Sequence, residues 1–351
     1  MPFHRGHEYL IQEAARFCEH LYILVYSNPD PAKLNSEMRS ELIKKSLGPQ
    51  RINGAILHFR WADANNVPFD YADDYTQRET LKRYIERRGS SIPYPDAVFT
   101  SESYGPGFAR HLGVEHHMID MDRSHIPVSG TMIRENVYEN MEWMPEPFQR
   151  FYRTDYIERV AFLGAESTGK STISRVMAEE YDTHNTTEYG RDMCEGDKYH
   201  KIDTHGMETI VKEQEAMEDG LIESGTCKHF LFCDTNAITT LFYAYEYNNE
   251  ASSLIWDVAS RCKERYDHVF LCDIDIPFED DGTRRLSGQA HKLQDSMVRM
   301  QLDWFDIPYV ILRGTIEERI ETIRNYLDYH KQRDYYLPSY EFMRKMEKNI
   351  V

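Results

Sequence analysis

A glycine-rich stretch in the middle of the chain, GAESTGKS at positions 164–171, carries the clearest chemistry. It matches G-x-x-x-x-G-K-[ST], the pattern of the phosphate-binding loop, and it lies between an apolar strand-like run and a segment with helical apolar spacing. Glycine lets the backbone approach phosphate oxygens closely, and a helix N-terminus favours negative charge. An ordinary glycine-containing turn is the alternative. The expected ATP-binding residues are Gly164, Glu166, Ser167, Thr168, Gly169, Lys170, Ser171 and Thr172, with Lys170 on the β- and γ-phosphates and Ser171 on Mg²⁺.

Polar residues after two other strand-like runs extend this candidate site. Asp234 follows the apolar run 229–233 and is interpreted as a Mg²⁺ ligand or as the base that accepts a hydroxyl proton. Capping of the next helix is the alternative for Asp234. Glu188, Tyr189 and Arg191 are candidates for binding ribose hydroxyls, stacking on a ring and pairing with a phosphate, respectively, and a plain polar loop is the alternative.

Two adjacent cations, Arg284 and Arg285, follow an acidic turn at 280–282. Enzymes that transfer phosphoryl groups bring positive charge to the γ-phosphate, so this segment is a candidate lid over ATP. A solvated charged loop accounts for the same residues equally well.

A second constellation lies in the first half of the chain. His4 and His7 stand three residues apart around a glycine, at the start of an expected helix, where both can face one phosphate group. Ser129, Gly130 and Thr131 open another expected helix, and Arg134 follows one turn later. Capping is the alternative for either piece alone. Together they indicate a second anion site.

The composition limits the class of protein. The chain has 351 residues, enough for two domains, with 41% hydrophobic and 28% charged residues, as in soluble globular proteins. Its net charge of −18 argues against a general nucleic-acid binder. No apolar run is long enough to span a bilayer, and no signal peptide is recognisable. The six cysteines fit neither C-x-x-C nor a zinc pattern, which predicts reduced thiols in a cytoplasmic protein.

The elements that position these residues alternate between strands and helices. In the first half we expect strands at 21–26, 55–60, 97–100 and 116–120, and helices at 7–19, 36–47, 76–88 and 131–138. A linker is expected at 145–155. In the second half we expect strands at 157–163, 184–187, 229–233, 267–272 and 308–312, and helices at 171–181, 204–224, 286–305 and from about 316, before a Tyr-rich tail. This alternation predicts two α/β domains with parallel sheets, at 1–147 and 156–351.

The order of the motifs resembles one family. HRGH at 4–7 with VSGTMIR at 128–134 is similar to the nucleotidyltransferase superfamily, and the whole series resembles the bifunctional NadR-type proteins, in which nicotinamide mononucleotide (NMN) adenylyltransferase is fused to ribosylnicotinamide kinase. The further matches are SESYG at 101–105, the phosphate-binding loop, EYGR at 188–191, Asp234-Thr235 with ITT at 238–240, and DDGTR at 280–284.

The resemblance implies a Rossmann-like nucleotidyltransferase domain followed by a P-loop kinase domain. It implies that the second half phosphorylates nicotinamide riboside with ATP and Mg²⁺, and that the first half joins NMN to AMP, giving NAD and pyrophosphate. Lys170, Asp234, His4, His7 and Arg134 would be catalytic. Glu102 and Tyr104 would lie near the substrate. Trp61 and Trp143 could stack on a nicotinamide ring, although packing in the core is the expected role of each.

One departure concerns the start of the first domain. In the family a strand and a G-x-F-x-P segment precede H-x-G-H, and here only Met1, Pro2 and Phe3 do so. That strand is central, so its loss would expose unpaired edges in the middle of a sheet. We therefore expect the true start to lie upstream of Met1. A riboside kinase with a degenerate first half, or a pyridine-nucleotide sensor without turnover, are the alternatives. Small-molecule substrates are the expected partners, and a homo-oligomer is compatible with the sequence.

Overall fold

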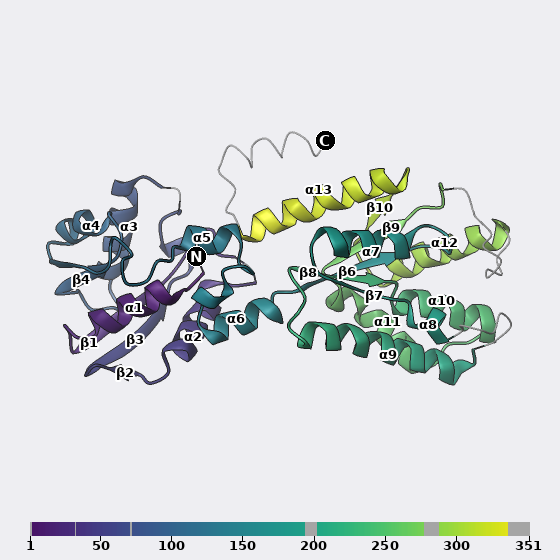
Figure 1. Cartoon of the computed structure of the whole chain (residues 1–351), viewed down its shortest axis with the longest axis horizontal. Coiled ribbons are helices and arrows are strands. Elements are labelled where there is room, and N and C mark those ends of the chain that lie inside the picture. The colour runs from purple at the N-terminus through teal and green to yellow at the C-terminus, as the bar shows by residue number, and fades with distance from the viewer. Residues whose placement is uncertain (1, 32, 71, 194–201, 277–287, 336–351) are drawn as a thin grey trace. The chain divides into compact units, whose positions relative to one another are not determined.

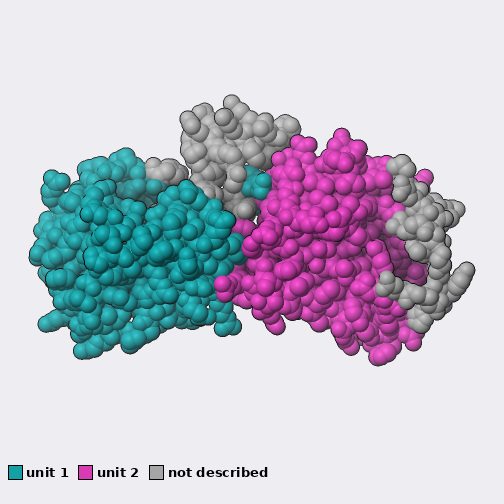
Figure 2. Space-filling view, viewed as in Figure 1, with its two compact units in different colours: residues 1–150, 328–351 teal, residues 151–327 magenta. Residues whose placement is uncertain are grey.

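The computed structural model describes residues 2–31, 33–70, 72–193, 202–276 and 288–335 (Figure 1). The chain divides into two compact units, the first with residues 1–150 and 328–351 and the second with residues 151–327 (Figure 2). Among the helices described, none is long and apolar enough to cross a membrane.

The second unit is built on a five-stranded parallel sheet with the order β10-β9-β6-β8-β7. Its strands are β6 (Glu158–Leu163), β7 (His184–Thr186), β8 (Phe230–Asp234), β9 (His268–Cys272) and β10 (Val310–Leu312). Strands buried on both faces read as continuous apolar runs, and β8 and β9 are buried along their whole length. Because β6 is the central strand, the loop that follows it lies at the edge where α/β sheets bind ligands.

Helices cover both faces of this sheet. Figure 1 shows α7 and α13 above the strands and α9 and α11 below them. Phe162, Phe232 and Phe270 of the strands pack with Ile173 of α7 and Ile323 of α13 in one fully buried cluster. The helices of this half are α7 (Lys170–Glu180), α8 (Tyr189–Met193), α9 (Thr204–Glu223), α10 (Ala237–Asn248), α11 (Ser253–Arg265), α12 (Gly288–Trp304) and α13 (Ile316–Tyr335).

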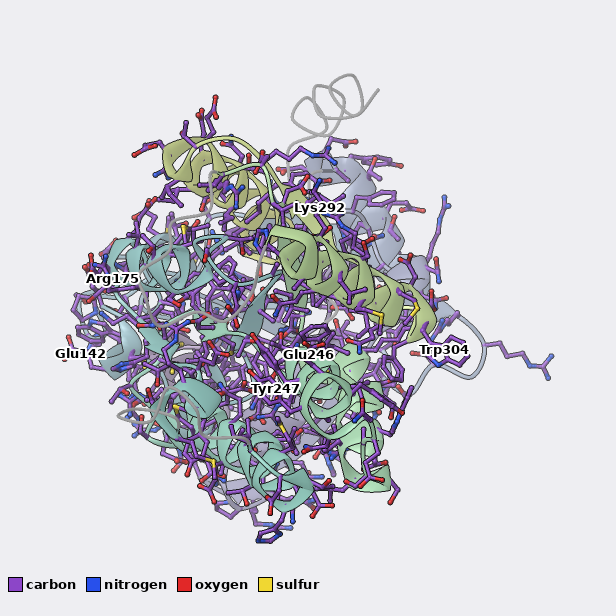
Figure 3. The ribbon with its side chains drawn as sticks, turned by 90° about the vertical axis from the view of Figure 1, so that its right-hand side faces the viewer. Glu142, Arg175, Glu246, Tyr247, Lys292 and Trp304 are labelled. Carbon is purple, nitrogen blue, oxygen red and sulfur yellow. The ribbon has the colours of Figure 1, made fainter. Side chains whose placement is uncertain are left out.

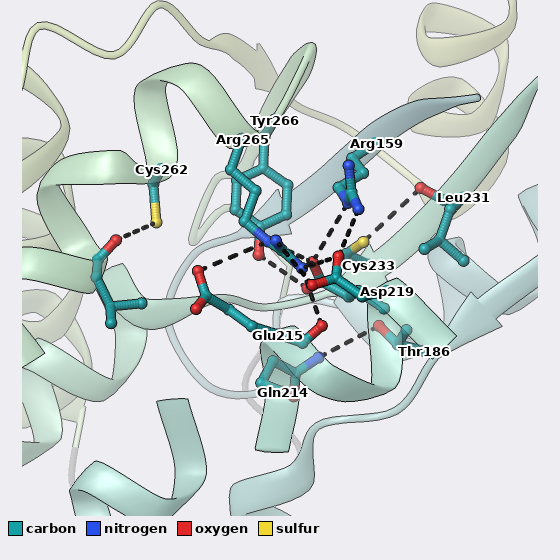
Figure 4. A network of polar contacts seen from close by, with 12 residues as sticks. Arg159, Thr186, Gln214, Glu215, Asp219, Leu231, Cys233, Cys262, Arg265 and Tyr266 are labelled. Carbon is teal, nitrogen blue, oxygen red and sulfur yellow. Dashed lines mark hydrogen bonds and ion pairs between the residues drawn. The ribbon is translucent and has the colours of Figure 1, made fainter. Parts of the chain in front are cut away.

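A buried ionic network connects α9 and α11 to the first residues of β6 (Figure 4). Glu218 of α9 accepts hydrogen bonds from Arg265 Nε at 2.9 Å and from the Tyr266 hydroxyl at 2.8 Å. Asp219 accepts from Arg265 at 2.9 Å and from Arg159 at 2.6 Å. Since Arg159 is the second residue of β6, the network lies at the opposite end of this strand from the glycine-rich loop.

The first unit distributes its strands between two sheets. β1 (His20–Val25) runs parallel to β3 (Ala55–Trp61), which pairs antiparallel with β2 (Arg51–Ile52), whereas β4 (Ala97–Thr100) and β5 (Glu115–Met118) form a separate parallel pair. The parallel α/β class is therefore confirmed, and the proposed upstream strand stays a prediction. The helices are α1 (Arg5–Ala14), α2 (Ser36–Leu47), α3 (Asp74–Glu86), α4 (Gly105–Leu112), α5 (Gly130–Glu135) and α6 (Glu146–Arg153), with 3-10 turns at Ala64–Asn66 and Met141–Trp143.

One expectation about a connecting segment was wrong. The linker expected at 145–155 is largely helix α6, with Phe148, Phe151 and Tyr152 buried. Its prolines suggested a break, but Pro147 lies in the first turn, where a missing N–H costs nothing. Residues 101–104 of the SESYG match form turns that lead into helix α4, which begins with Gly-Pro-Gly and is followed by Gly113 in a left-handed conformation.

The described cysteines are unpaired, as expected. Cys227, Cys233, Cys262 and Cys272 are buried, and Cys18 is half-buried. Cys194 and the Tyr-rich tail lie outside the described residues.

Candidate functional site

The loop between β6 and α7 has a backbone that requires its glycines. Gly164 has φ 135°, and a Cβ there would lie 2.5 Å from the Cys272 carbonyl oxygen at the end of β9. Gly169 has φ 85°, and a Cβ there would lie 2.7 Å from Ile316 Cδ1. Any side chain at Gly164 would therefore collide with backbone, which explains why the motif specifies glycine.

Lys170 is held inside this loop. Its ammonium group donates to the Ala165 carbonyl oxygen at 2.8 Å, and the Thr168 hydroxyl donates to the same oxygen at 2.8 Å. Only 7% of the Lys170 surface is exposed, so the charge faces the loop rather than bulk water. This position suits a cation whose partner is an anion bound within the loop.

Arg319 of α13 supports the same loop and was not identified from the sequence. Its side chain is fully buried and donates to the Thr168 carbonyl oxygen at 2.9 Å and to the Asp273 carbonyl oxygen at 3.0 Å. It also donates to Gly314 at 3.0 Å and forms an ion pair with Asp275. Arg319 thus fixes the loop to the ends of β9 and β10. A single arginine within a helix carries no local signal of such a role.

Asp234 ends β8 beside β6, as expected, with Phe162 as its register partner. It is 2% exposed, and its Oδ1 accepts no hydrogen bond from the described residues. Thr235 follows with φ 77°, a strained value for a β-branched residue, and Asn236 caps α10. A buried carboxylate oxygen in such a turn needs a proton, a cation or a donor as its partner.

Tyr189 and Arg191 belong to helix α8 rather than to a loop, and Glu188 directly precedes this helix. Arg191 pairs with Glu188 at 3.0 Å and donates to the Ser171 hydroxyl at 3.3 Å, which places this segment against the start of α7. Burial raises the pKa of Glu188, and repulsion from Asp234 and Glu166 adds to this, whereas Lys170 and Arg191 oppose it. The structure therefore brings five expected residues together, namely Lys170, Ser171, Glu188, Arg191 and Asp234.

Glu166 is fixed by residues that the sequence did not indicate. Its Oε1 accepts from the Tyr243 hydroxyl of α10 at 2.6 Å, and its backbone N–H donates to Gln294 of α12 at 2.9 Å. His291 of α12 donates from Nε2 to the Glu166 carbonyl oxygen at 2.7 Å. Gln294 also donates to the Tyr243 hydroxyl at 3.1 Å, which closes the network. Figure 3 looks onto this end of the second unit and shows α12 passing above α10, with Lys292 and Tyr247 labelled on them.

Among the residues described, no group of three or more His, Cys, Asp or Glu side chains could hold a metal ion by itself. The Ser171 hydroxyl and the open Asp234 oxygen suit Mg²⁺ that is held mainly by phosphate oxygens and water. The expected lid residues Arg284 and Arg285 lie outside the described residues.

In the first unit, the two expected anion-binding segments meet. His4 caps α1 and stacks on His7 with ring centroids 3.8 Å apart, and a Cβ on Gly6 would lie 3.5 Å from Val128. Burial lowers the pKa of His4 to about 4, and the nearby positive charges of Arg123 and Arg134 add to the effect. Burial likewise lowers the pKa of His7. Both rings are therefore neutral N–H donors at neutral pH.

The other residues expected to bind an anion lie at the start of α5. The Ser129 hydroxyl accepts from the Met132 N–H at 3.1 Å and so caps the helix, whose first residues are Gly130 and Thr131. Arg134 donates to the Thr131 hydroxyl at 3.0 Å. The helix N-terminus, with its unpaired N–H groups, therefore opens beside the guanidinium of Arg134.

The expected substrate residues of the first unit follow the strand ends. Glu102 pairs at 3.2 Å with Arg123, a cation that the sequence analysis missed. Tyr104 is 53% exposed and lies near Tyr26. Trp61 ends β3 and is 46% exposed, so its expected packing in the core was wrong; it lies at the last pair of the β1–β3 ladder, at the margin of the sheet. Trp143 is half-buried in a 3-10 turn.

Comparisons with known proteins match both halves. A family model described as an AAA domain matches residues 159–319, and one described as the citrate lyase ligase C-terminal domain matches residues 1–58. The trifunctional NAD biosynthesis/regulator protein NadR of Escherichia coli (strain K12) is 25% identical over 315 residues, which cover 85% of this chain and 73% of that protein. The protein of the same name from Salmonella typhimurium (strain LT2) is 26% identical over 314 residues, with the same coverage.

Two solved structures show the same fold along the chain. They are NadR protein in complex with NAD and AMP-PNP, at 20% identity, and NadR protein in complex with NR, at 19% identity. Each has a TM-score of 0.50 and covers 93% of both chains. This chain is therefore an α/β protein with a nucleotidyltransferase-like domain followed by a P-loop kinase domain. In sequence and in domain order it is a NadR-like protein.

Proposed function

We propose that this protein is an NAD-salvage enzyme with two activities. The second unit phosphorylates the 5′-hydroxyl of nicotinamide riboside with ATP, and the first unit joins the resulting mononucleotide to AMP from a second ATP, giving NAD and pyrophosphate. The observation that carries the proposal is the meeting of Lys170, Ser171, Glu188, Arg191 and Asp234 at one edge of the kinase sheet.

Catalysis in the kinase half depends on position and charge. Lys170 leaves the Ala165 carbonyl oxygen to bind the β- and γ-phosphates, and Arg191 adds positive charge beside Ser171. Mg²⁺ supplies further neutralisation and would be held by Ser171 and Asp234. The riboside hydroxyl attacks the γ-phosphorus in line, and its proton passes to a carboxylate. Asp234 and Glu188 are the two carboxylates available for metal binding and proton acceptance.

The adenylyltransferase half needs no covalent intermediate. The NMN phosphate attacks the α-phosphorus of ATP in line, and pyrophosphate leaves. His4 and His7 donate neutral N–H groups, while Arg123, Arg134 and the N-terminus of α5 provide positive charge. Exposed Trp61 and Tyr104 are available to contact the pyridine ring.

A second candidate function is a riboside kinase whose first unit does not turn over. It is favoured by the division of β1–β3–β2 and β4–β5 into separate sheets, because anion-binding segments at strand ends depend on a rigid sheet for their spacing. A pyridine-nucleotide sensor is the remaining alternative.

One assay separates these functions. The full chain is incubated with ATP, Mg²⁺ and either nicotinamide riboside or NMN, and the products are separated by chromatography. Formation of both NMN and NAD supports the two-activity enzyme. NMN alone selects the kinase, and tight binding with neither product selects the sensor.

A further inference from the structure

The kinase site carries more negative charge than a site for ATP alone would need. Among the described charged residues that interact with Glu188, Glu166 and Asp234 are acidic like Glu188 itself, whereas Lys170 and Arg191 are basic. Lys170 and Arg191 lie against the loop and Ser171, on the phosphate side. Part of the positive charge that balances these carboxylates must therefore come from the other substrate or from the metal ion.

The carboxylate of Glu166 is explained neither by metal binding nor by proton acceptance, the two roles given to Asp234 and Glu188. Its Oε1 accepts from Tyr243 at 2.6 Å, but its Oε2 is buried and accepts no hydrogen bond from any residue that the structure describes. The backbone of Glu166 is held by Gln294 and His291, and its carboxylate is held by the hydrogen bond from Tyr243. A fixed, desolvated carboxylate oxygen is costly unless a donor or a cation meets it.

A second buried carboxylate, Asp234, interacts with the same neighbour, Glu188. Asp234 is 2% exposed with an open Oδ1, and it repels Glu188, which in turn interacts with Glu166. Tyrosines border this acidic group: Tyr243 interacts with Glu166 and Glu188, and its ring lies 5.4 Å from that of Tyr247 on α10. Carboxylates beside aromatic rings are the surroundings that stabilise an organic cation.

We propose that Glu166, supported by Tyr243, selects a nucleoside whose base carries a fixed positive charge. This inference rests on the proposed kinase function and deepens it. A cationic pyridinium ring neutralises Glu166 by contact, whereas an uncharged base of the same shape would leave the carboxylate buried and uncompensated. The side chain of Glu166 then acts on the acceptor nucleoside, although its backbone belongs to the ATP-binding loop.

The test compares two ribosides of nearly equal shape: nicotinamide riboside, which is cationic, and its reduced dihydropyridine form, which is neutral. We expect the wild-type chain to favour the cation in both kcat/KM and binding affinity by about tenfold or more. Glu166→Gln keeps an acceptor for the Tyr243 hydroxyl but removes the charge. The substitution should remove most of this preference, because it weakens the binding of the cationic riboside. The affinity for the neutral riboside should stay within about threefold of the wild-type value.

A matched control is Glu213→Gln, which removes one negative charge from the exposed face of α9. It should leave the preference and both affinities unchanged. Melting temperatures of the variants check that each is folded.

Binding is measured by calorimetry without ATP, so the result does not depend on turnover. If Glu166→Gln lowered the affinity for both ribosides equally, Glu166 would only accept a hydrogen bond or support the loop. This result would overturn the inference while leaving the kinase function intact. No phosphorylation of any riboside by the wild-type chain would instead refute the proposed function, and the binding preference would still decide the role of Glu166.

Discussion

The guanidinium of Arg319 donates a hydrogen bond of 2.9 Å to the carbonyl oxygen of Thr168, a residue 151 positions earlier in the chain. The contact joins helix α13 to the phosphate-binding loop. Because the arginine is fully buried, its removal would leave an acidic partner, Asp275, and several carbonyl oxygens without their donor.

We therefore expect Arg319→Lys to destabilise the second unit by about 3 kcal/mol, since lysine cannot replace a planar fork that reaches several acceptors. ATP affinity should fall with it. Chemical denaturation and ATP titration measure the two effects. The control is Arg324→Lys on the same helix, where the side chain is 43% exposed and pairs with Glu180. It should change stability by no more than about 0.5 kcal/mol. Equal effects of the two substitutions would contradict this role of Arg319.

Lys170→Ala should abolish riboside phosphorylation, with a loss of at least about a hundredfold in kcat, because the loop loses its charge on the phosphates. Formation of NAD from NMN should remain, since His4, His7 and Arg134 form a separate set in the first unit. Product analysis with each substrate measures both rates. Loss of both activities in a folded variant would show that the two sites are not independent.

The stability of the first unit should depend on pH through His4. Its pKa is lowered from 6.5 to about 4 in the fold, so the unfolded chain binds more protons between these values. The stability that the fold gains from keeping His4 neutral is complete above pH 6.5 and is lost as the pH falls toward 4. The shift in pKa corresponds to about 3 kcal/mol in the free energy of unfolding.

Hydrogen exchange of the amides of β1 and β3 at pH 7 and pH 5 measures this dependence. His4→Gln should reduce this dependence to the part that His7 contributes, because burial lowers the pKa of His7 as well, whereas His125→Gln, at an exposed histidine in the same unit, should leave the wild-type slope. An unchanged slope in His4→Gln would show that another group titrates.

The ionic network at the start of β6 predicts a stability effect without a catalytic one. Glu218→Gln leaves the guanidinium of Arg265 with a weaker partner and should cost about 3 kcal/mol. Because the network lies at the end of β6 away from the loop, the affinity for ATP should stay within about twofold under conditions where the protein is folded. A large loss of ATP affinity at full folding would mean that the network reaches the loop through β6.

The sequence predicted β6, β8 and β9 of the second unit well because their apolar runs are continuous and bounded by polar turns. The five residues expected around the loop do lie together, since each follows a strand or opens a helix at one edge of the sheet. The residues that were missed, Tyr243, Gln294 and Arg319, reach the loop across 77 to 151 positions. Periodicity along a chain contains no information about such contacts. The exposure of Trp61 was missed for a related reason, because a strand's last residue can extend beyond the layer that covers it.

The division of the first unit into two sheets has a consequence for the handling of the protein. β1 has the sequence HLYILV, is rich in β-branched and aromatic residues, carries no Asp, Glu, Lys or Arg, and pairs on one side only among the described strands. Such a segment is a template for amyloid-like stacking between molecules. The first unit expressed alone should precipitate at concentrations where the second unit alone remains in solution, and a lysine in place of Ile23 should slow the precipitation.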